Sequence, residues 1–249
     1  MIAAQPQVGS AGWLTTRPIA HRGLHGSDAP ENTLPAFEAA ARAAYPIELD
    51  VHMLSDGTVV VFHDDDLLRA ARLRRTLAEE TTLSIRDHKL FGTSHGIPTL
   101  SEVLEQVAGR VPILVEIKSR HGQQGVEQAV YQQLMRYHGE VAVQSFNPFA
   151  VAWFADNAPH ITRGQLAGPL DDDKALTSFQ RFATRSLLSA LWSRPHFINY
   201  DLRGLPDAWV QNVARAARLP LLCWTVRTPP DKIKADQLGA NYVFDQLRP

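Results

Sequence analysis

The alternation of short, β-branched runs with longer segments of helical period restricts the fold of this chain more than any other feature of its sequence. Such alternation is typical of βαβ units around a parallel sheet. Eight units in 249 residues predict a single (β/α)8 barrel domain over residues 1–249, with a doubly wound sheet as the competing fold. The eight expected strands are 18–21, 46–52, 111–118, 141–146, 161–167, 197–201, 220–226 and 241–245.

Segments between the expected strands carry helix start and stop signals. The strongest is 99–109, where Thr99 and Glu102 have the spacing of a capping box and Gly109 can end the helix. The other expected helices are 34–45, 206–218 and 229–238.

One segment breaks the alternation. Asp56-Gly57 lies between two alternating apolar runs, which is a strong hairpin signal, so 58–63 is expected to return antiparallel to the second strand. With the turn centred on these two residues, His63 would lie opposite Asp50. The stretch 64–98 is then a short insertion after the second strand, above the mouth of the barrel.

Composition excludes several classes of protein. With 45% apolar and 20% charged side chains, the chain is expected to be globular and not disordered or collagen-like. A net charge of −1 does not provide the basic surface that nucleic-acid binding needs. Cys223 is the only cysteine, so an internal disulfide and a cysteine metal cluster are both excluded.

Neither an apolar run of about 18 residues nor a leader peptide is visible in the sequence. We therefore expect a cytoplasmic protein with no stable membrane insertion and no nucleic-acid partner. The sequence carries no signal for an oligomeric state.

Polar side chains occupy inward positions of the expected barrel. In the second expected strand apolar residues alternate with Glu48 and Asp50, so these two carboxylates point to the opposite face, into the barrel. The same count places Glu116, Lys118 and His21 inside. Barrel interiors are normally apolar, whereas catalytic groups lie at the C-terminal ends of the strands, so these residues indicate an active site.

Each of these residues alone has an ordinary explanation, because a strand-end carboxylate is usually solvated and a lone histidine is usually a satisfied core residue. Three carboxylates in one half-buried site repel one another unless a cation compensates. A divalent cation, Ca or Mg, is therefore expected, with Glu48, Asp50 and Glu116 as oxygen ligands. Arg22 and Lys118 beside it would favour an anionic substrate such as a phosphate.

A series of short motifs in fixed order resembles the glycerophosphodiester phosphodiesterase family over about 18–245. No single tripeptide is specific, but the ordered set is. The motifs are His21-Arg22-Gly23, Pro30-Glu31-Asn32-Thr33, Glu48-Leu49-Asp50-Val51, Asp56-Gly57 with Val59 to His63-Asp64, Pro98-Thr99-Leu100, Glu116-Ile117-Lys118, Gln144-Ser145-Phe146 and Trp224-Thr225-Val226.

The resemblance implies a (β/α)8 barrel with an insertion after the second strand. It also implies hydrolysis of small-molecule glycerophosphodiesters to glycerol 3-phosphate and an alcohol, a reaction of lipid and glycerol metabolism. The implied roles are general acid and base for His21 and His63, divalent-cation ligands for Glu48, Asp50 and Glu116, phosphate binding for Arg22 and Lys118, and a glycerol-side contact for Trp224.

The chemistry of a phosphodiester explains this set of residues. The substrate is an anion with a poor leaving alkoxide, so the site must neutralise the non-bridging oxygens and protonate the leaving oxygen. The cation with Arg22 and Lys118 meets the first need, and two imidazoles meet the second near neutral pH. The nucleophile is either a metal-bound water or the adjacent glycerol hydroxyl, through a cyclic phosphate. His63, expected opposite Asp50, could also be a ligand of the cation.

Other functions fit the same residues. An activity of the lysophospholipase D type would use the same headgroup chemistry, with an apolar groove beside the insertion for the acyl chain. A catalytically silent barrel would bind a phosphorylated ligand without turnover, and the presence of both histidines and all three carboxylates argues against it. Arg227 stands where the family usually carries Asn, which favours an additional negative charge on the substrate.

Overall fold

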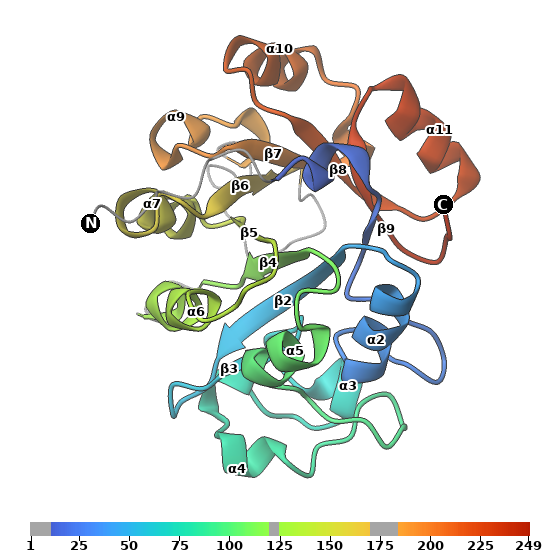
Figure 1. Ribbon diagram of the computed structural model, residues 1–249, viewed down its shortest axis with the longest axis vertical. Coiled ribbons are helices and arrows are strands. Elements are labelled where there is room, and N and C mark those ends of the chain that lie inside the picture. The colour runs from blue at the N-terminus through green and yellow to red at the C-terminus, as the bar shows by residue number, and fades with distance from the viewer. Residues whose placement is uncertain (1–10, 120–124, 170–183) are drawn as a thin grey trace. The chain divides into compact units, whose positions relative to one another are not determined.

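The computed structural model describes residues 11–119, 125–169 and 184–249 (Figure 1). Each strand expected from the sequence is present, with ends that differ by up to two residues. The strands are β1 (Ile19–Ala20), β2 (Ile47–Met53), β3 (Val59–Val61), β4 (Ile113–Ile117), β5 (Val141–Ser145), β6 (Thr162–Ala167), β7 (Phe197–Asp201), β8 (Leu221–Val226) and β9 (Asn241–Phe244).

All nine strands belong to one sheet, in the order β1-β9-β8-β7-β6-β5-β4-β2-β3, with an additional pairing of β1 with β2. Of these strands, β3 pairs antiparallel with β2, whereas the pairings of β2 with β4 and of β6 with β7 are parallel. This order is that of a (β/α)8 barrel, so the predicted fold class is correct and the doubly wound sheet is not adopted.

Helices separate the strands as the sequence predicts. The capping box before α5 is present, because Thr99 Oγ1 accepts from the N–H of Glu102 and Glu102 Oε2 accepts from the N–H of Thr99. The described helices are α1 (Trp13–Thr16), α2 (Leu34–Arg42), α3 (Leu68–Ala71), α4 (Thr82–Ile85), α5 (Leu100–Val107), α6 (Val126–Leu134), α7 (Pro148–Asn157), α9 (Ala190–Ser193), α10 (Ala208–Ala216) and α11 (Pro229–Gln237), with 3-10 turns η1 (Leu77–Glu79) and η2 (Leu202–Gly204). Within these residues, none of the helices combines the length and apolar character that crossing a membrane requires.

The chain divides into two compact units. One unit is Ala20–Val141, and the other consists of the described parts of 1–19 and 142–249. In the first unit α2 and α5 pack against each other, and Gln106 Nε2 of α5 donates to the carbonyl of Leu34, 3.0 Å away (Figure 1). In the second unit β6, β7, β8 and β9 run parallel.

The insertion has a hydrophobic core of its own. It consists of short elements, α3, η1 and α4, joined by loops. This core includes Leu54 beside the hairpin turn, Val60 in β3 and Phe62 directly after β3. The insertion therefore packs against the hairpin formed by β2 and β3. The buried side chains of the core are Leu54, Val60, Phe62, Leu67, Ala70, Leu77, Ile85, Leu90 and Ile97.

The expected register of the hairpin is wrong by one residue. Val51 pairs with Val61, and the N–H of Phe62 donates to the carbonyl of Asp50 at 2.9 Å, so Phe62 and not His63 lies opposite Asp50. The cause is the turn, in which Leu54 and Thr58 pair across a three-residue loop that ends in Gly57 at φ +84°. A three-residue loop with a left-handed last residue shifts the pairing by one position relative to a two-residue turn.

Candidate active site

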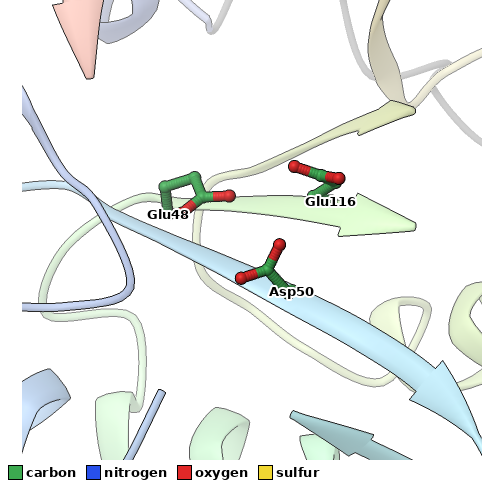
Figure 2. Close-up of side chains that lie close together, drawn as sticks. All are labelled: Glu48, Asp50 and Glu116. Carbon is green, nitrogen blue, oxygen red and sulfur yellow. The ribbon is translucent and has the colours of Figure 1, made fainter. Parts of the chain in front are cut away.

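Three buried carboxylates meet on the two adjacent strands β2 and β4. On β2 the alternation of side chains turns Glu48 and Asp50 to the same face, and the parallel register sets Asp50 directly beside Glu116. Their exposed fractions are 2%, 1% and 7% for Glu48, Asp50 and Glu116. One oxygen from each carboxylate lies within 4.8 Å of the others, and Figure 2 shows the three groups gathered along these strands.

Two cationic side chains, those of Lys118 and Arg22, lie beside the carboxylates. Lys118 Nζ lies 2.9 Å from Asp50 Oδ1 and 2.5 Å from Glu116 Oε1. Arg22 contributes its Nε, 3.3 Å from Asp50 Oδ2, and its backbone N–H, which donates to Glu48 Oε2 at 3.1 Å. The structure thus brings together five residues that the sequence predicted for the site.

The charges around Asp50 keep it ionised. Burial opposes its ionisation, but the positive charges of Lys118 and Arg22, with smaller effects of His63 and His21, hold the pKa of Asp50 below its ordinary value. These electrostatic effects also mean that both imidazoles lie in the neighbourhood of Asp50. The same carboxylates raise the pKa of Lys118 against the effect of its burial, so the ammonium stays charged.

Glu48 responds in the opposite direction. Burial, followed by the negative charges of Asp50 and Glu116, raises the pKa of Glu48 well above its ordinary value. The positive charge of the described neighbours is therefore not enough for three ionised carboxylates. This is the condition under which a divalent cation would be bound, and the three oxygen ligands have the hard chemistry that Mg and Ca prefer.

His63 is oriented by its neighbour in sequence. Its Nδ1 lies 2.6 Å from Asp64 Oδ1, and its side chain remains 34% exposed. An imidazole whose Nδ1–H donates to a carboxylate has its Nε2 available for proton exchange with a substrate. His21 directly follows β1, so both histidines stand at strand ends of the same unit.

Two residues near the site were not given a role by the sequence. Asn32 donates from Nδ2 to Asp50 Oδ2 at 2.8 Å, and Glu31 Oε1 accepts from Arg22 Nη1 at 2.6 Å. Asn32 has a left-handed backbone with φ +56°, a conformation that Asn tolerates better than most residues. The residue type was therefore the local hint in the sequence of a special role for this position. Nothing in local spacing indicates that its amide reaches a strand 18 residues further along the chain.

Trp224 belongs to the other unit, on β8. Its ring is T-shaped to that of Phe146, with centroids 5.6 Å apart. In the same unit Arg227 Nε lies 3.5 Å from Asp245 Oδ2, so the arginine that departs from the family pattern already has a carboxylate neighbour. The substrate contact of Trp224 stays a prediction, as does the single-domain organisation of the chain.

Comparisons with known proteins agree with this fold and indicate a family. The chain is 29% identical over 233 residues to YhdW of Bacillus subtilis, covering 90% of this chain and 91% of that protein. It is 29% identical over 264 residues to glycerophosphodiester phosphodiesterase 1 of Bos taurus, covering 92% and 77%. A phosphodiesterase of Oleispira antarctica, solved in complex with the product sn-glycerol-3-phosphate, has a TM-score of 0.75 at 23% identity, with 92% of each chain covered.

The fold is a (β/α)8 barrel in which buried carboxylates lie beside cationic side chains at the ends of adjacent strands. Residues 21–245 match the model of the glycerophosphoryl diester phosphodiesterase family, and the chain belongs to this family. The protein is accordingly a phosphoric diester hydrolase whose substrates are glycerophosphodiesters.

Proposed function

We propose that the enzyme releases glycerol 3-phosphate and an alcohol from its substrate with the help of a divalent cation held by Glu48, Asp50 and Glu116. The observation that carries this proposal is the approach of three carboxylate oxygens to within 4.8 Å of one another in a buried site. Family membership supports the reaction class. The sn-glycerol-3-phosphate bound to the Oleispira antarctica relative supports the product.

The cation we propose is Mg or Ca, because the ligand set consists of carboxylate oxygens. When bound, it would act as a Lewis acid on the phosphate and offset the developing negative charge. The raised pKa of Glu48, caused by burial and by Asp50 and Glu116, supports this choice, since a divalent charge would allow all three carboxylates to ionise together.

Arg22 and Lys118 are proposed to hold the phosphate. Both stay charged, because the neighbouring carboxylates raise the pKa of each against the opposing effect of burial. A planar guanidinium and a compact ammonium that approach the carboxylates from different strand ends can donate to different non-bridging oxygens of one phosphate. Their fixed positions would orient the ester without reorganisation during the reaction.

His21 and His63 are proposed to exchange protons with the nucleophile and the leaving oxygen. The two imidazoles follow different strands and both affect Asp50 electrostatically, which supports positions around one reacting centre. His63 would act through Nε2, because Asp64 engages its Nδ1 at 2.6 Å. Trp224, paired with Phe146, is proposed to contact the carbon skeleton of the glycerol.

Substitution of each histidine tests the roles of the pair. We expect His21→Ala and His63→Ala each to lower kcat by roughly 100- to 10,000-fold, because each removes a proton-transfer group. Binding of glycerol 3-phosphate, followed by calorimetry, should change far less, since neither imidazole is assigned to hold the phosphate. His138→Ala is the control, because His138 is exposed on the same unit. Wild-type turnover in either site variant would refute the acid and base assignment.

A further inference from the structure

Arg69 of α3 binds two carboxylates at once, both of which contact predicted site residues. Its Nε lies 2.6 Å from Asp64 Oδ2, and its Nη2 lies 3.1 Å from Asp64 Oδ1. The same guanidinium donates from Nη2 to Glu31 Oε1 at 2.7 Å and from Nη1 to Glu31 Oε2 at 3.2 Å. A planar fork with donors in fixed directions is the one side chain suited to such double pairing.

Each of these two carboxylates also contacts one residue to which the proposed function gives a role. Glu31 Oε1 accepts from Arg22 Nη1 at 2.6 Å, and Asp64 Oδ1 pairs with His63 Nδ1 at 2.6 Å. Arg69 is therefore the common partner behind the phosphate-binding arginine and the oriented imidazole. Glu31 lies in the loop before α2, and Asp64 lies in the loop after β3. Among the described contacts, Arg69 is the side chain that binds both of these loops.

The charges in this network agree with its geometry. Burial opposes ionisation of Asp64, but hydrogen bonds from His63 and Arg69 hold its pKa below the ordinary value. Burial likewise opposes ionisation of Glu31, and Arg69 and Arg22 hold the pKa of Glu31 down. Both carboxylates thus remain charged acceptors, which is the state in which each can orient its partner.

The insertion fixes Arg69 in place. Its neighbours Leu67 and Ala70 belong to the buried core of the insertion. The guanidinium carbon lies 5.3 Å from the centroid of the Phe91 ring, and the N–H of Phe91 donates to the carbonyl of Ala70 at 2.7 Å. Phe91 itself has φ +52°, an uncommon backbone conformation for a bulky residue.

A purely structural role explains this arrangement less well. The Arg69 side chain is 47% exposed, and isolated exposed ion pairs contribute little to stability. Arg69 donates four hydrogen bonds to Asp64 and Glu31, the two carboxylates that contact His63 and Arg22. An arginine that was only solvated at the surface would not need to bind both of these carboxylates.

We propose that Arg69 is a positioning residue through which the insertion sets the orientation of His63, by way of Asp64, and of Arg22, by way of Glu31. The proposal rests on the function proposed above for these two residues. The path through Asp64 acts on proton transfer and thus on kcat, whereas the path through Glu31 acts on phosphate binding and thus on KM. A lysine at this position would keep the charge but lose the fork.

The test compares Arg69→Lys with Arg74→Lys, an exposed arginine of the same insertion. We expect Arg69→Lys to lower kcat by roughly 10- to 100-fold and to raise KM by a smaller factor, as displacement of supporting groups usually does. Arg74→Lys should match the wild type. Both are assayed well below the Tm of each variant. An unchanged kcat in Arg69→Lys overturns the proposal, and so does a collapse of its Tm, which would make Arg69 a structural residue.

A double-mutant cycle separates the two paths. In the background of Asp64→Asn, which already removes the partner of His63, we expect Arg69→Lys to change kcat by less than about twofold and still to raise KM. Losses in kcat that multiply would show that Arg69 does not act through Asp64. His63→Ala distinguishes the failures: full turnover in His63→Ala overturns both proposals, whereas an inactive His63→Ala beside a fully active Arg69→Lys overturns this one alone.

Discussion

Glu48 and Asp50 are two residues apart on one strand face, yet the environment moves their pKa values in opposite directions. Asp50 has Lys118, Arg22 and the amide of Asn32 within hydrogen-bonding or ion-pairing distance. Glu48 accepts one described hydrogen bond, from the backbone N–H of Arg22, and is buried against two negative charges. The site is therefore asymmetric, and a cation that entered it would relieve Glu48 the most.

A half-buried imidazole outside the site, that of His196, gives a prediction on pH. Burial, followed by the charge of Arg163, lowers the pKa of His196 to about 4 from an ordinary value of 6.5. Between these values the unfolded chain binds a proton that the folded protein does not, so the free energy of unfolding falls as the pH falls. We expect His196→Gln to lose less stability between pH 7 and pH 5 than the wild type does, measured by urea unfolding.

The control for this prediction is His138→Gln, which changes an exposed histidine. It should keep the pH dependence of the wild type. An identical loss of stability in the wild type and in His196→Gln would mean that the folded protein protonates His196 as readily as the unfolded chain does.

At the scale of elements, the loop between β1 and α2 depends on the close approach of a glycine to a helix. Gly23 has φ +83°, and a Cβ at this position would lie 2.8 Å from the carbonyl carbon of Ala36 in α2. A larger residue at position 23 would therefore displace the loop. His21 and Arg22 lie in the same loop, directly before Gly23.

We expect Gly23→Ala to destabilise the protein by roughly 1–3 kcal/mol, through the strained backbone and the contact with α2. The displacement should also lower kcat/KM, because the loop carries two site residues. Thermal unfolding and turnover measure the two effects. Gly26→Ala is a matched control in the same loop, since a Cβ there meets no atom within 4 Å. Equal behaviour of the two variants would disprove the argument from close approach.

The elements also show which parts of the fold are readable from sequence. Long periodic segments such as α5 and β2 were predicted correctly because capping and alternation are local properties. The position of the insertion was predicted but its internal elements were not, because α3 and α4 have four residues each and are too short to display a period. Its core forms from contacts between loops, which no local pattern encodes. The hairpin register failed for a similar reason.

The turn illustrates this limit in detail. Asp56 and Gly57 correctly predict a hairpin, but the side chain of Asp56 accepts from the N–H of Thr58 at 3.1 Å and from the N–H of Thr82 at 2.8 Å. The second contact comes from the insertion, so tertiary structure contributes to the choice of loop length. A one-residue change in loop length then alters which residue of the return strand lies opposite Asp50.

At the scale of the whole molecule, one unit contains nearly the entire predicted site. All predicted site residues except Trp224 lie within Ala20–Val141. Alternation on β2 and β4 was sufficient to predict that the carboxylates of these strands face one another, because the register of parallel strands follows from their apolar faces. The support given by Glu31 and Arg69 was not predictable, since it joins residues 38 positions apart through the folded insertion.

The central claim is that Glu48, Asp50 and Glu116 bind a divalent cation on which hydrolysis depends. The most direct test is release of glycerol 3-phosphate from glycerophosphocholine by the purified protein, with Mg, with Ca and with a chelator. Glu116→Gln is measured beside Glu105→Gln, which changes an exposed glutamate of α5. Metal binding by both variants is followed by calorimetry as a second readout.

We predict release that needs a divalent cation, stops on chelation and returns when the cation is restored. Glu116→Gln should bind the cation weakly and lower release by more than roughly 100-fold, whereas Glu105→Gln should match the wild type. Undiminished release in the presence of the chelator, or a Glu116→Gln protein as active as Glu105→Gln, would contradict the account.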